Sequence, residues 1–427
     1  MSNISEQRNL IVGLDLCNDF TQISCFNNKT FEPDSISMYP NQERYFIPTV
    51  LGIRSDTKDW IYGEDAFNYN NLQKGVLIED LLVKVEKDLD TEIFGVQFKP
   101  VTLLEKYLRK CLQLLKIYHP TNSIKKIVIT LKNSNDIIAS AVYQALDNLG
   151  VGKDRAYVQS HLQSYQYFAL SQSKELWMND IGLFKFDESG LYYYQITINR
   201  KSQPYIVGMI EKDFSETLSY DMIEELKDSE NLEYIFETIA NTVLFKQIVP
   251  TIYITGKGFE GSWSDNVLKE LCVGRRVFKG QNLFTKGACY AAKEFTGEDS
   301  KFDDYLFLSC DMIMSTFFIQ AYYDAKISDV ILAKAGTPWY QIDEKLDIIL
   351  DDEQNITIHV QDVVKRETVL YSLELTGLPK RPNKLTRIGI RIRFVNKETA
   401  IVTAKDKGFG DFYPSTDRIW EKEIKIS

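Results

Sequence analysis

Three short segments of this chain carry residue types that could bind a phosphate group. Two of them, residues 14–20 and 180–187, are Asp-centred turns that follow apolar runs at matching places in the two halves of the chain. The third, residues 256–258, is a Gly-Lys-Gly turn after the apolar run 251–255. Glycine, present in the second and third segments, lets backbone N–H groups approach a phosphate closely. The matching Asp-centred turns suggest a duplicated nucleotide fold. The candidate nucleotide-binding residues are Asp15, Asn18, Asp180, Gly182, Gly256, Lys257 and Gly258.

These turns also allow a plainer interpretation. An Asp at the end of a strand commonly caps a turn, which would explain Asp15 and Asp180 without any ligand. A G-x-G sequence after a strand is likewise often only a turn. Whether the three segments bind a ligand therefore depends on the helices and strands that position them.

The predicted elements follow the same order in both halves of the first 300 or so residues. The first half is expected to contain strands at residues 10–15, 21–26, 46–53 and 126–130, and helices at residues 102–118, 135–149 and 160–173. The second half is expected to contain strands at residues 181–187, 191–199, 204–210, 251–255 and 276–278, and helices at residues 215–245, 264–271 and 284–294. An order of elements in which a meander is followed by helices and buried strands, and which occurs twice, predicts a duplicated α/β domain.

The pattern changes after residues 297–300. Apolar and polar residues then alternate with a period of two, and turn residues separate the runs, which is typical of a β-sandwich. The expected strands are residues 345–350, 356–360, 368–375, 388–394 and 400–404. We therefore predict an α/β domain at residues 1–302, with lobes at about 1–170 and 171–302, and a β-sandwich at residues 303–427.

Composition excludes several classes of function. The net charge of −10 argues against nucleic-acid binding, and no apolar run approaches a membrane span of about 20 residues. Residues 1–9 are polar and lack the apolar core of a signal peptide, so a cytoplasmic protein without a membrane partner is expected. The six cysteines contain no C-x-x-C pair, and none of the three histidines has metal-ligand spacing. We predict no metal site and no catalytic residues.

Several further motifs add to this pattern. Residues 11–16 (IVGLDL), 47–50 (IPTV), 61–66 (IYGEDA), 371–379 (YSLELTGLP) and 401–407 (IVTAKDK) occur in that order. Together with the glycine turn at 256–258, these segments resemble the DnaK-type heat-shock chaperones of the actin-like ATPase superfamily, over nearly the whole chain. The chain looks like a divergent bacterial branch of that superfamily.

The resemblance implies a fold and a cofactor. The fold would be α/β, a duplicated actin-like (ribonuclease H-like) two-lobed domain followed by a C-terminal β-sandwich that binds peptides. The family's helical lid is not expected after this β-sandwich. By the same resemblance, Asp15 matches the position that holds the water shell of Mg²⁺, and Asp180 matches its counterpart in the second turn. ATP with Mg²⁺ would then be the cofactor.

The phosphate turns depart from the family pattern. Where the family has Gly and Thr, the first turn has Cys17, Asn18 and Asp19, and the second has Leu-Phe-Lys at residues 183–185. A carboxylate about 5 Å from a phosphate oxygen costs about 3 kcal/mol at an effective dielectric near 20, or roughly a hundredfold in affinity. The family's catalytic Lys has only Lys84 as a weak counterpart, and residues 159–162 lack its Asn-Glu-Pro.

A basic band marks the C-terminal domain. Its members are Lys380, Arg381, Lys384, Arg387, Arg391 and Arg393. An acidic partner would explain this band, and so would a solvated sheet face opposite the core.

Two functions therefore compete. The first is a non-catalytic, chaperone-like scaffold with a degenerate ATP site and no bound cofactor, which binds a protein or peptide partner through its β-domain. The second is an ATP-binding chaperone in which Asp15 and Asp180 hold Mg²⁺ and hydrolysis is slow. An assembling cytoskeletal relative is a third interpretation, against which the attached β-domain argues.

Overall fold

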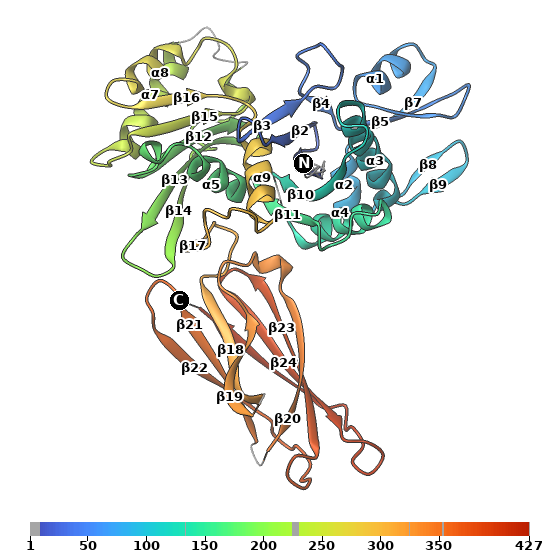
Figure 1. The fold of residues 1–427 in the computed structure, drawn as a ribbon, viewed down its shortest axis with the longest axis vertical. Coiled ribbons are helices and arrows are strands. Elements are labelled where there is room, and N and C mark those ends of the chain that lie inside the picture. Colours follow the sequence, from blue (N-terminus) through green and yellow to red (C-terminus); the bar gives the residue numbers. More distant parts are fainter. Residues whose placement is uncertain (1–8, 133, 224–229, 324, 352–353, 427) are drawn as a thin grey trace, which may run out of the picture. The chain divides into compact units, whose positions relative to one another are not determined.

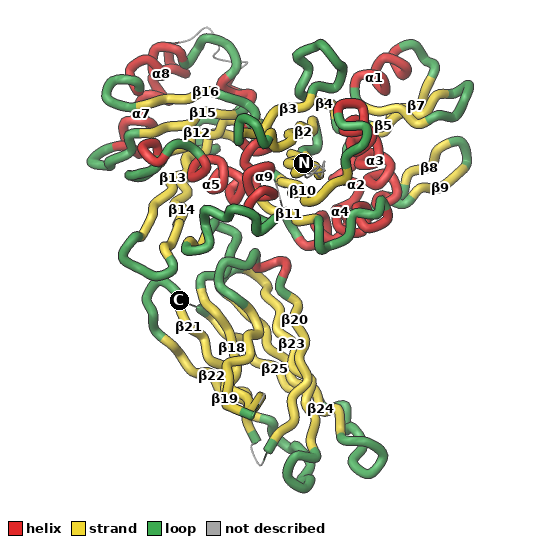
Figure 2. The backbone as a smooth tube through the Cα atoms, in the orientation of Figure 1, coloured by secondary structure: helices red, strands yellow, loops and turns green. Residues whose placement is uncertain are grey.

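The chain forms two compact units, Met1–Tyr305 and Leu306–Ser427. The computed structural model describes residues 9–132, 134–223, 230–323, 325–351 and 354–426. The class is mixed α/β, as the sequence predicts (Figure 1). The helices that the structure describes lie in the first unit, except for the 3₁₀ turn Trp339–Gln341 in the second (Figure 2). Within the described residues, no helix has the length and apolar composition needed to cross a membrane.

The first sheet of the first unit has the strand order β11-β10-β1-β2-β3, and β4 pairs with β2. Strand β1 runs parallel to β10 and antiparallel to β2. Its residues are almost all buried, as expected for a strand covered on both faces. The strands are β1 (Asn9–Leu16), β2 (Phe20–Asn27), β3 (Glu32–Ile36), β4 (Ile47–Pro48), β10 (Ser123–Leu131) and β11 (Ala156–Ser160).

The second sheet repeats this arrangement with the order β16-β15-β12-β13-β14-β17. Strand β12 again runs parallel to one neighbour, β15, and antiparallel to the other, β13. The two sheets therefore place their long hairpins, β1–β2 and β12–β13, in corresponding positions. The strands are β12 (Ile181–Asp187), β13 (Gly190–Asn199), β14 (Tyr205–Asp213), β15 (Thr251–Thr255), β16 (Arg276–Lys279) and β17 (Tyr305–Phe307).

Helices α5 (His161–Ser171) and α9 (Leu283–Glu294) pack against each other. Helix α5 follows a strand of the first sheet and also contacts the second sheet, whereas α9 follows a strand of the second sheet and packs on the first. The hydroxyl of Tyr165 on α5 donates to the Ile181 carbonyl of the second sheet. Helix α9 lies so close to the first sheet that a Cβ on Gly13 would collide with the backbone of Thr285. This close crossing brings the carboxyl ends of β1 and β12 to a common region.

The other helices and small sheets surround this framework. The helices are α1 (Glu64–Asn71), α2 (Leu81–Glu86), α3 (Pro100–Tyr118), α4 (Asp136–Asn148), α7 (Glu230–Leu244) and α8 (Asp265–Leu271), with 3₁₀ turns at Lys174–Leu176 and Lys257–Phe259. The small sheets join β5 (Leu51–Arg54), β6 (Trp60–Tyr62) and β7 (Gly75–Ile78), and β8 (Thr91–Ile93) with β9 (Val96–Phe98).

The second unit contains two antiparallel four-stranded sheets, ordered β19-β18-β21-β22 and β20-β23-β24-β25. Alternate side chains of both sheets form one core, which includes Phe317, Ile358, Ile390 and Val402. The strands are β18 (Ser315–Tyr323), β19 (Lys326–Ala333), β20 (Asp343–Leu350), β21 (Asn355–Asp362), β22 (Thr368–Glu374), β23 (Thr386–Asn396), β24 (Thr399–Gly408) and β25 (Ile419–Lys425).

The structure corrects several sequence predictions. Residues 46–53 are not one strand but β4 and β5, and the third strand of the meander is β3, which was not predicted. The helical stretch predicted at residues 215–245 is confirmed only in part. Turns and bends occupy residues 215–221, residues 222–223 and α7 from Glu230 are helical, and residues 224–229 lie outside the described part. The second phosphate turn is wrong. Residues 181–187 form the uninterrupted strand β12, whose Leu183 and Phe184 are completely buried, and the hairpin turns at residues 188–189.

Candidate functional site

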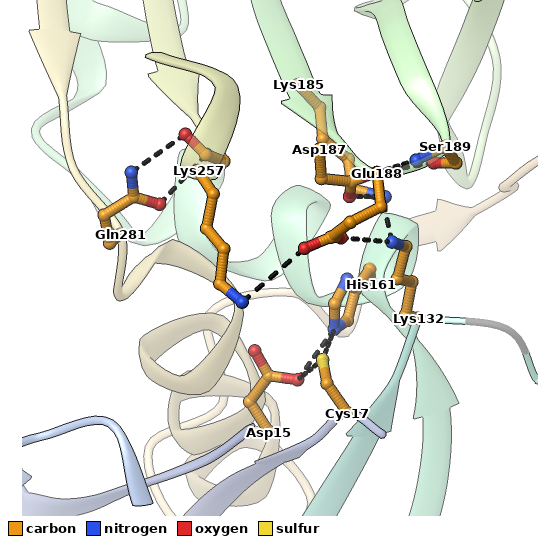
Figure 3. A network of polar contacts seen from close by, with 11 residues as sticks. Asp15, Cys17, Lys132, His161, Lys185, Asp187, Glu188, Ser189, Lys257 and Gln281 are labelled. Carbon is orange, nitrogen blue, oxygen red and sulfur yellow. Dashed lines mark hydrogen bonds and ion pairs between the residues drawn. The ribbon is translucent and has the colours of Figure 1, made fainter. Parts of the chain in front are cut away.

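A small pocket with charged side chains in its lining lies between the ends of the hairpins β1–β2 and β12–β13 (Figure 3). Its volume is about 40 Å³. The lining residues are Asp15, Cys17, Asp19, Phe20, Phe46, Lys132, His161, Lys185, Asp187, Glu188, Thr255, Gly256, Lys257, Gln281 and Phe284.

The two hairpins contribute equivalent positions to this pocket. Residues 17–20 connect the paired strands of the first hairpin, and residues 187–190 occupy the same place in the second. Asp15 and Lys185 each pair with a threonine of the adjoining parallel strand, β10 or β15. The equivalent positions are therefore Asp15 and Lys185, and Cys17 and Asp187.

A lysine from each sheet pairs with a carboxylate on the hairpin of the other sheet. Lys132, just after β10, lies 3.0 Å from Asp187 and 3.4 Å from Glu188. Lys257, just after β15, pairs with Asp19 and lies 3.5 Å from Glu188. These ion pairs connect each hairpin to the opposite sheet.

Asp187 is the best-compensated carboxylate of the pocket. Its oxygens lie 3.0 Å from the ammoniums of both Lys185 and Lys132, and it accepts a hydrogen bond from the Ser189 N–H at 3.0 Å. Burial alone would raise the pKa of Asp187, but the ammonium of Lys185 and then that of Lys132 lower it well below its usual range. Asp187 is therefore a structural anion.

Asp15, Cys17 and His161 form a second buried group. Oδ1 of Asp15 lies 2.7 Å from His161 Nε2, Cys17 Sγ lies 3.4 Å from Asp15 Oδ1, and the Cys17 sulfur lies 3.8 Å from His161 Nε2. In Figure 3 the oxygen and the sulfur converge on the same ring nitrogen. His161 begins α5 behind the cap residue Ser160, and its ring stacks on Phe284 at 3.9 Å.

This arrangement does not fit a Cys-His nucleophile. In such a site the imidazole takes the thiol proton at one nitrogen while a third group holds the other nitrogen. Here Asp15 and Cys17 share Nε2, and Nδ1 of His161 has no hydrogen-bond partner among the described residues. Burial, together with the charges of Asp15 and Asp19, raises the pKa of the Cys17 thiol well above its usual value. The thiol is therefore protonated and unreactive in the structure as it stands.

The structure places Asp15, Gly256 and Lys257 in the pocket lining. The N–H of Gly256 donates to the Gln281 side chain at 3.0 Å, and its carbonyl accepts from the same amide at 3.0 Å. Gly256 has φ +104°, and a Cβ there would collide with the Phe186 carbonyl. This backbone is thus already hydrogen-bonded within the protein.

The remaining predicted site residues do not line the pocket. The Asn18 amide donates to Asp80 at 2.8 Å, and Gly258 packs on the Phe186 ring. Asp180 precedes β12, at the opposite end of that strand from the pocket, and accepts from Gln195 at 2.8 Å. The two other residues considered for the site are Gly182, which lies against Tyr193 and Val249 near the same end, and Lys84, which lies on α2 outside the lining.

Sequence comparison matches residues 32–310 to the family described as "Family of unknown function (DUF5716) C-terminal". The chain belongs to this family. Residues 312–426 match a second description, "Domain of unknown function (DUF8552)". The two matched ranges meet close to the boundary between the two structural units. No curated protein is similar enough to be matched.

The pocket contains site residues that sequence reasoning missed, namely Cys17, Lys132, His161, Lys185 and Asp187. One signal was available for Lys132. Residues 129–132 (ITLK) and 254–257 (ITGK) repeat the same pattern at the ends of β10 and β15. Cys17 and His161 are 144 residues apart, so spacing could not reveal their contact.

The basic band lies in the DUF8552 part, where two of its members are paired within the unit. Arg381 makes a bidentate ion pair with the buried Asp406, at 2.7 and 2.8 Å. Arg391 pairs with Asp343 on the neighbouring strand β20. Arg387 and the other arginines of β23 alternate with core residues on an exposed face that also carries acidic side chains. The solvated-face interpretation explains this arrangement without a partner.

Proposed function

We propose that this protein is a non-catalytic, chaperone-like scaffold: an actin-like (ribonuclease H-like) duplicated domain with a degenerate ATP site, followed by a β-sandwich that binds a protein or peptide partner. The relation to DnaK-type chaperones and a cytoplasmic location remain predictions from the sequence. The charged side chains that occupy the pocket support this proposal most strongly.

The topology of the first unit supports the duplicated fold. Its two sheets share one strand order and one pattern of parallel and antiparallel pairing. Helices α5 and α9 pack together between them. In such a fold a nucleotide would lie where the two hairpins face each other, and the pocket is at that place.

The ion pairs across the pocket carry the proposal. Lys132 and Lys257 each pair with a carboxylate on the opposite hairpin, which is where phosphate groups would need positive charge. The pocket has a volume of only about 40 Å³, and the Gly256 N–H already donates to Gln281. The residues present therefore do not fit a nucleoside triphosphate in this arrangement. The protein's own charges take the place of the nucleotide.

The second unit offers an apolar surface to a partner. Strand register places Ile331, Phe318, His359 and Leu370 side by side across one sheet, on the face opposite the core. The Phe318 and His359 rings stack at 4.8 Å, while Ile331 and Leu370 are 53% and 59% exposed. Phe318 between them is only 8% exposed, so the exposed apolar side chains of this row are Ile331 and Leu370, and exposed apolar side chains are what a partner would contact.

Thermal unfolding in the presence of Mg-ATP tests the proposal against the ATP-binding alternative. A ligand at about 100 times its dissociation constant adds about 2.7 kcal/mol of stability. We expect no shift of the melting temperature at millimolar Mg-ATP. A clear shift that is abolished by Asp15→Ala, but not by Asp180→Ala at the far end of β12, would replace the scaffold with a nucleotide-binding protein.

A further inference from the structure

We propose that Asp15, Cys17 and His161 bind a divalent cation of the zinc class through Oδ1, Sγ and Nε2, with a fourth coordination position open to the pocket. All three side chains are buried, and all three line the pocket. The proposal goes beyond the scaffold function and does not depend on it.

The separations of the three ligand atoms are close to those around a tetrahedral zinc ion. Zinc bonds of about 2.0 Å to nitrogen and oxygen and 2.3 Å to sulfur place ligand atoms about 3.3 Å (N to O) and 3.5 Å (S to N or O) apart. The observed separations are 3.4 Å from Sγ to Oδ1, 3.8 Å from Sγ to Nε2 and 2.7 Å from Nε2 to Oδ1. The Sγ separations lie within about 0.3 Å of these values, and the Nε2–Oδ1 separation must lengthen by about 0.6 Å.

The backbone holds the ligands in place. Asp15 belongs to the buried strand β1, and the Cys17 N–H donates to the Phe20 carbonyl at 2.9 Å, which closes the turn. His161 is fixed by its stacking on Phe284. A metal site needs this kind of support, because ligands that move must be ordered when the ion binds.

The charge of the pocket also favours a dication. Its lining has four carboxylates and three ammoniums, which gives a net charge of −1, and a Cys17 thiolate would make the net charge −2. One divalent cation brings the sum to zero. The carboxylates are Asp15, Asp19, Asp187 and Glu188, and the ammoniums are Lys132, Lys185 and Lys257.

The ligand types select the metal. Thiolate and imidazole favour zinc and its soft or borderline neighbours, whereas Mg²⁺ and Ca²⁺ require oxygen ligands. Three protein ligands with one open position is the arrangement of zinc sites that bind a water or a small ligand. The proposed ion is therefore Zn²⁺ with a water in the pocket.

Calorimetric titration of the full chain with Zn²⁺, after removal of metals with a chelator, tests the site. We expect one ion per chain, with a dissociation constant below about 1 µM and no competition from millimolar Mg²⁺. Absence of saturable zinc binding by the folded chain would overturn the proposal.

Substitution of the ligands locates the ion. Loss of an outer partner of a metal ligand costs 10–100-fold in affinity, so Cys17→Ser and His161→Gln should each cost at least about 100-fold. The matched controls, Cys272→Ser and His119→Gln, should bind as the wild type does. Wild-type affinity in a folded Cys17→Ser variant would contradict the assignment.

X-ray absorption spectroscopy decides the matter if a ligand variant does not fold. The sample is the zinc-loaded chain in which Cys272 and Cys310, the cysteines that are not buried, are both replaced by Ser. We expect one sulfur at about 2.3 Å and two or three nitrogen or oxygen atoms at about 2.0 Å. A shell of only nitrogen and oxygen would overturn the proposal.

Discussion

The two hairpins of the first unit share a backbone arrangement but carry different chemistry. At the end of the second hairpin, Lys185 lies 3.0 Å from Asp187, so the strand supplies a cation to its own anion. At the equivalent positions of the first hairpin lie Asp15 and Cys17, and His161 joins them instead of a lysine. One hairpin is neutralised by its own side chain. The other presents ligand atoms to an external cation.

The two hairpins also differ in how they are tied to the opposite sheet. Asp187 is buried and contacts two lysines, whereas Asp19 is exposed and pairs with Lys257 at the surface. Ion pairs at the surface contribute little, but removal of one member of a buried pair leaves an uncompensated charge. Of these two carboxylates, Asp187 therefore contributes more to stability than Asp19 does.

The largest expected effect comes from Asp187→Ala. This substitution leaves Lys185 buried without its carboxylate, so we expect the free energy of unfolding of the first unit to fall by about 3 to 5 kcal/mol. Urea unfolding measures the change. The matched control is Asp19→Ala, for which the loss should stay below about 1 kcal/mol. Equal losses of unfolding free energy in the two variants would contradict the difference between Asp187 and Asp19.

The next effect concerns the backbone of two glycines that follow β15. Gly256 has φ +104° and its Cβ would collide with the Phe186 carbonyl, whereas Gly261 has φ +83° with open space around it. Gly256→Ala should therefore destabilise the first unit by about 2 to 3 kcal/mol, and Gly261→Ala by about 1 kcal/mol. Urea unfolding of both variants measures the difference. A Gly256→Ala variant as stable as the wild type would show that the loop can move away from β12.

The smallest expected effect is a dependence of stability on pH. The folded pKa of Asp187 lies below its unfolded value of about 3.9, so its contribution is complete above that value and is lost as the pH falls further. In that range the unfolded chain binds one more proton than the folded chain, which gives a slope of up to about 1.4 kcal/mol per pH unit.

Asp187→Asn isolates this titration. The variant should show a shallower loss of stability than the wild type between about pH 5 and about pH 3, measured by urea unfolding at each pH. The same acid dependence in both proteins would mean that Asp187 is not held as an anion by its two lysines.

Much of the fold could be predicted because periodicity reports burial. The strong 3.6-residue pattern predicts helix α3 to within two residues, and period-two alternation predicts β23 and β24. Strand β3 was missed because its sequence, EPDSI, lacks an apolar alternation and contains Pro33. The false second turn arose because an Asp before an apolar strand looks like a strand end. In the structure Asp180 begins the strand instead.

The site was harder to predict than the fold. Asp15 lies near the end of the buried strand β1, and Gly256 and Lys257 follow the buried strand β15, where a sequence pattern can be recognised. Lys185 and Asp187 reach the pocket because of the register of β12 with β13 and β15, and this register cannot be read from the sequence. His161 reaches Cys17 because α5 starts at the carboxyl end of β11, a tertiary relation.

Isothermal titration of Mg-ATP into the wild-type chain tests the central claim, that protein charges occupy the place of a nucleotide, most directly. With Lys132 and Lys257 paired to carboxylates of the opposite hairpins, we predict no saturable heat up to about 1 mM Mg-ATP, a limit that corresponds to a binding free energy weaker than about −4.1 kcal/mol. A saturable curve with one Mg-ATP per chain and a micromolar dissociation constant would contradict the account.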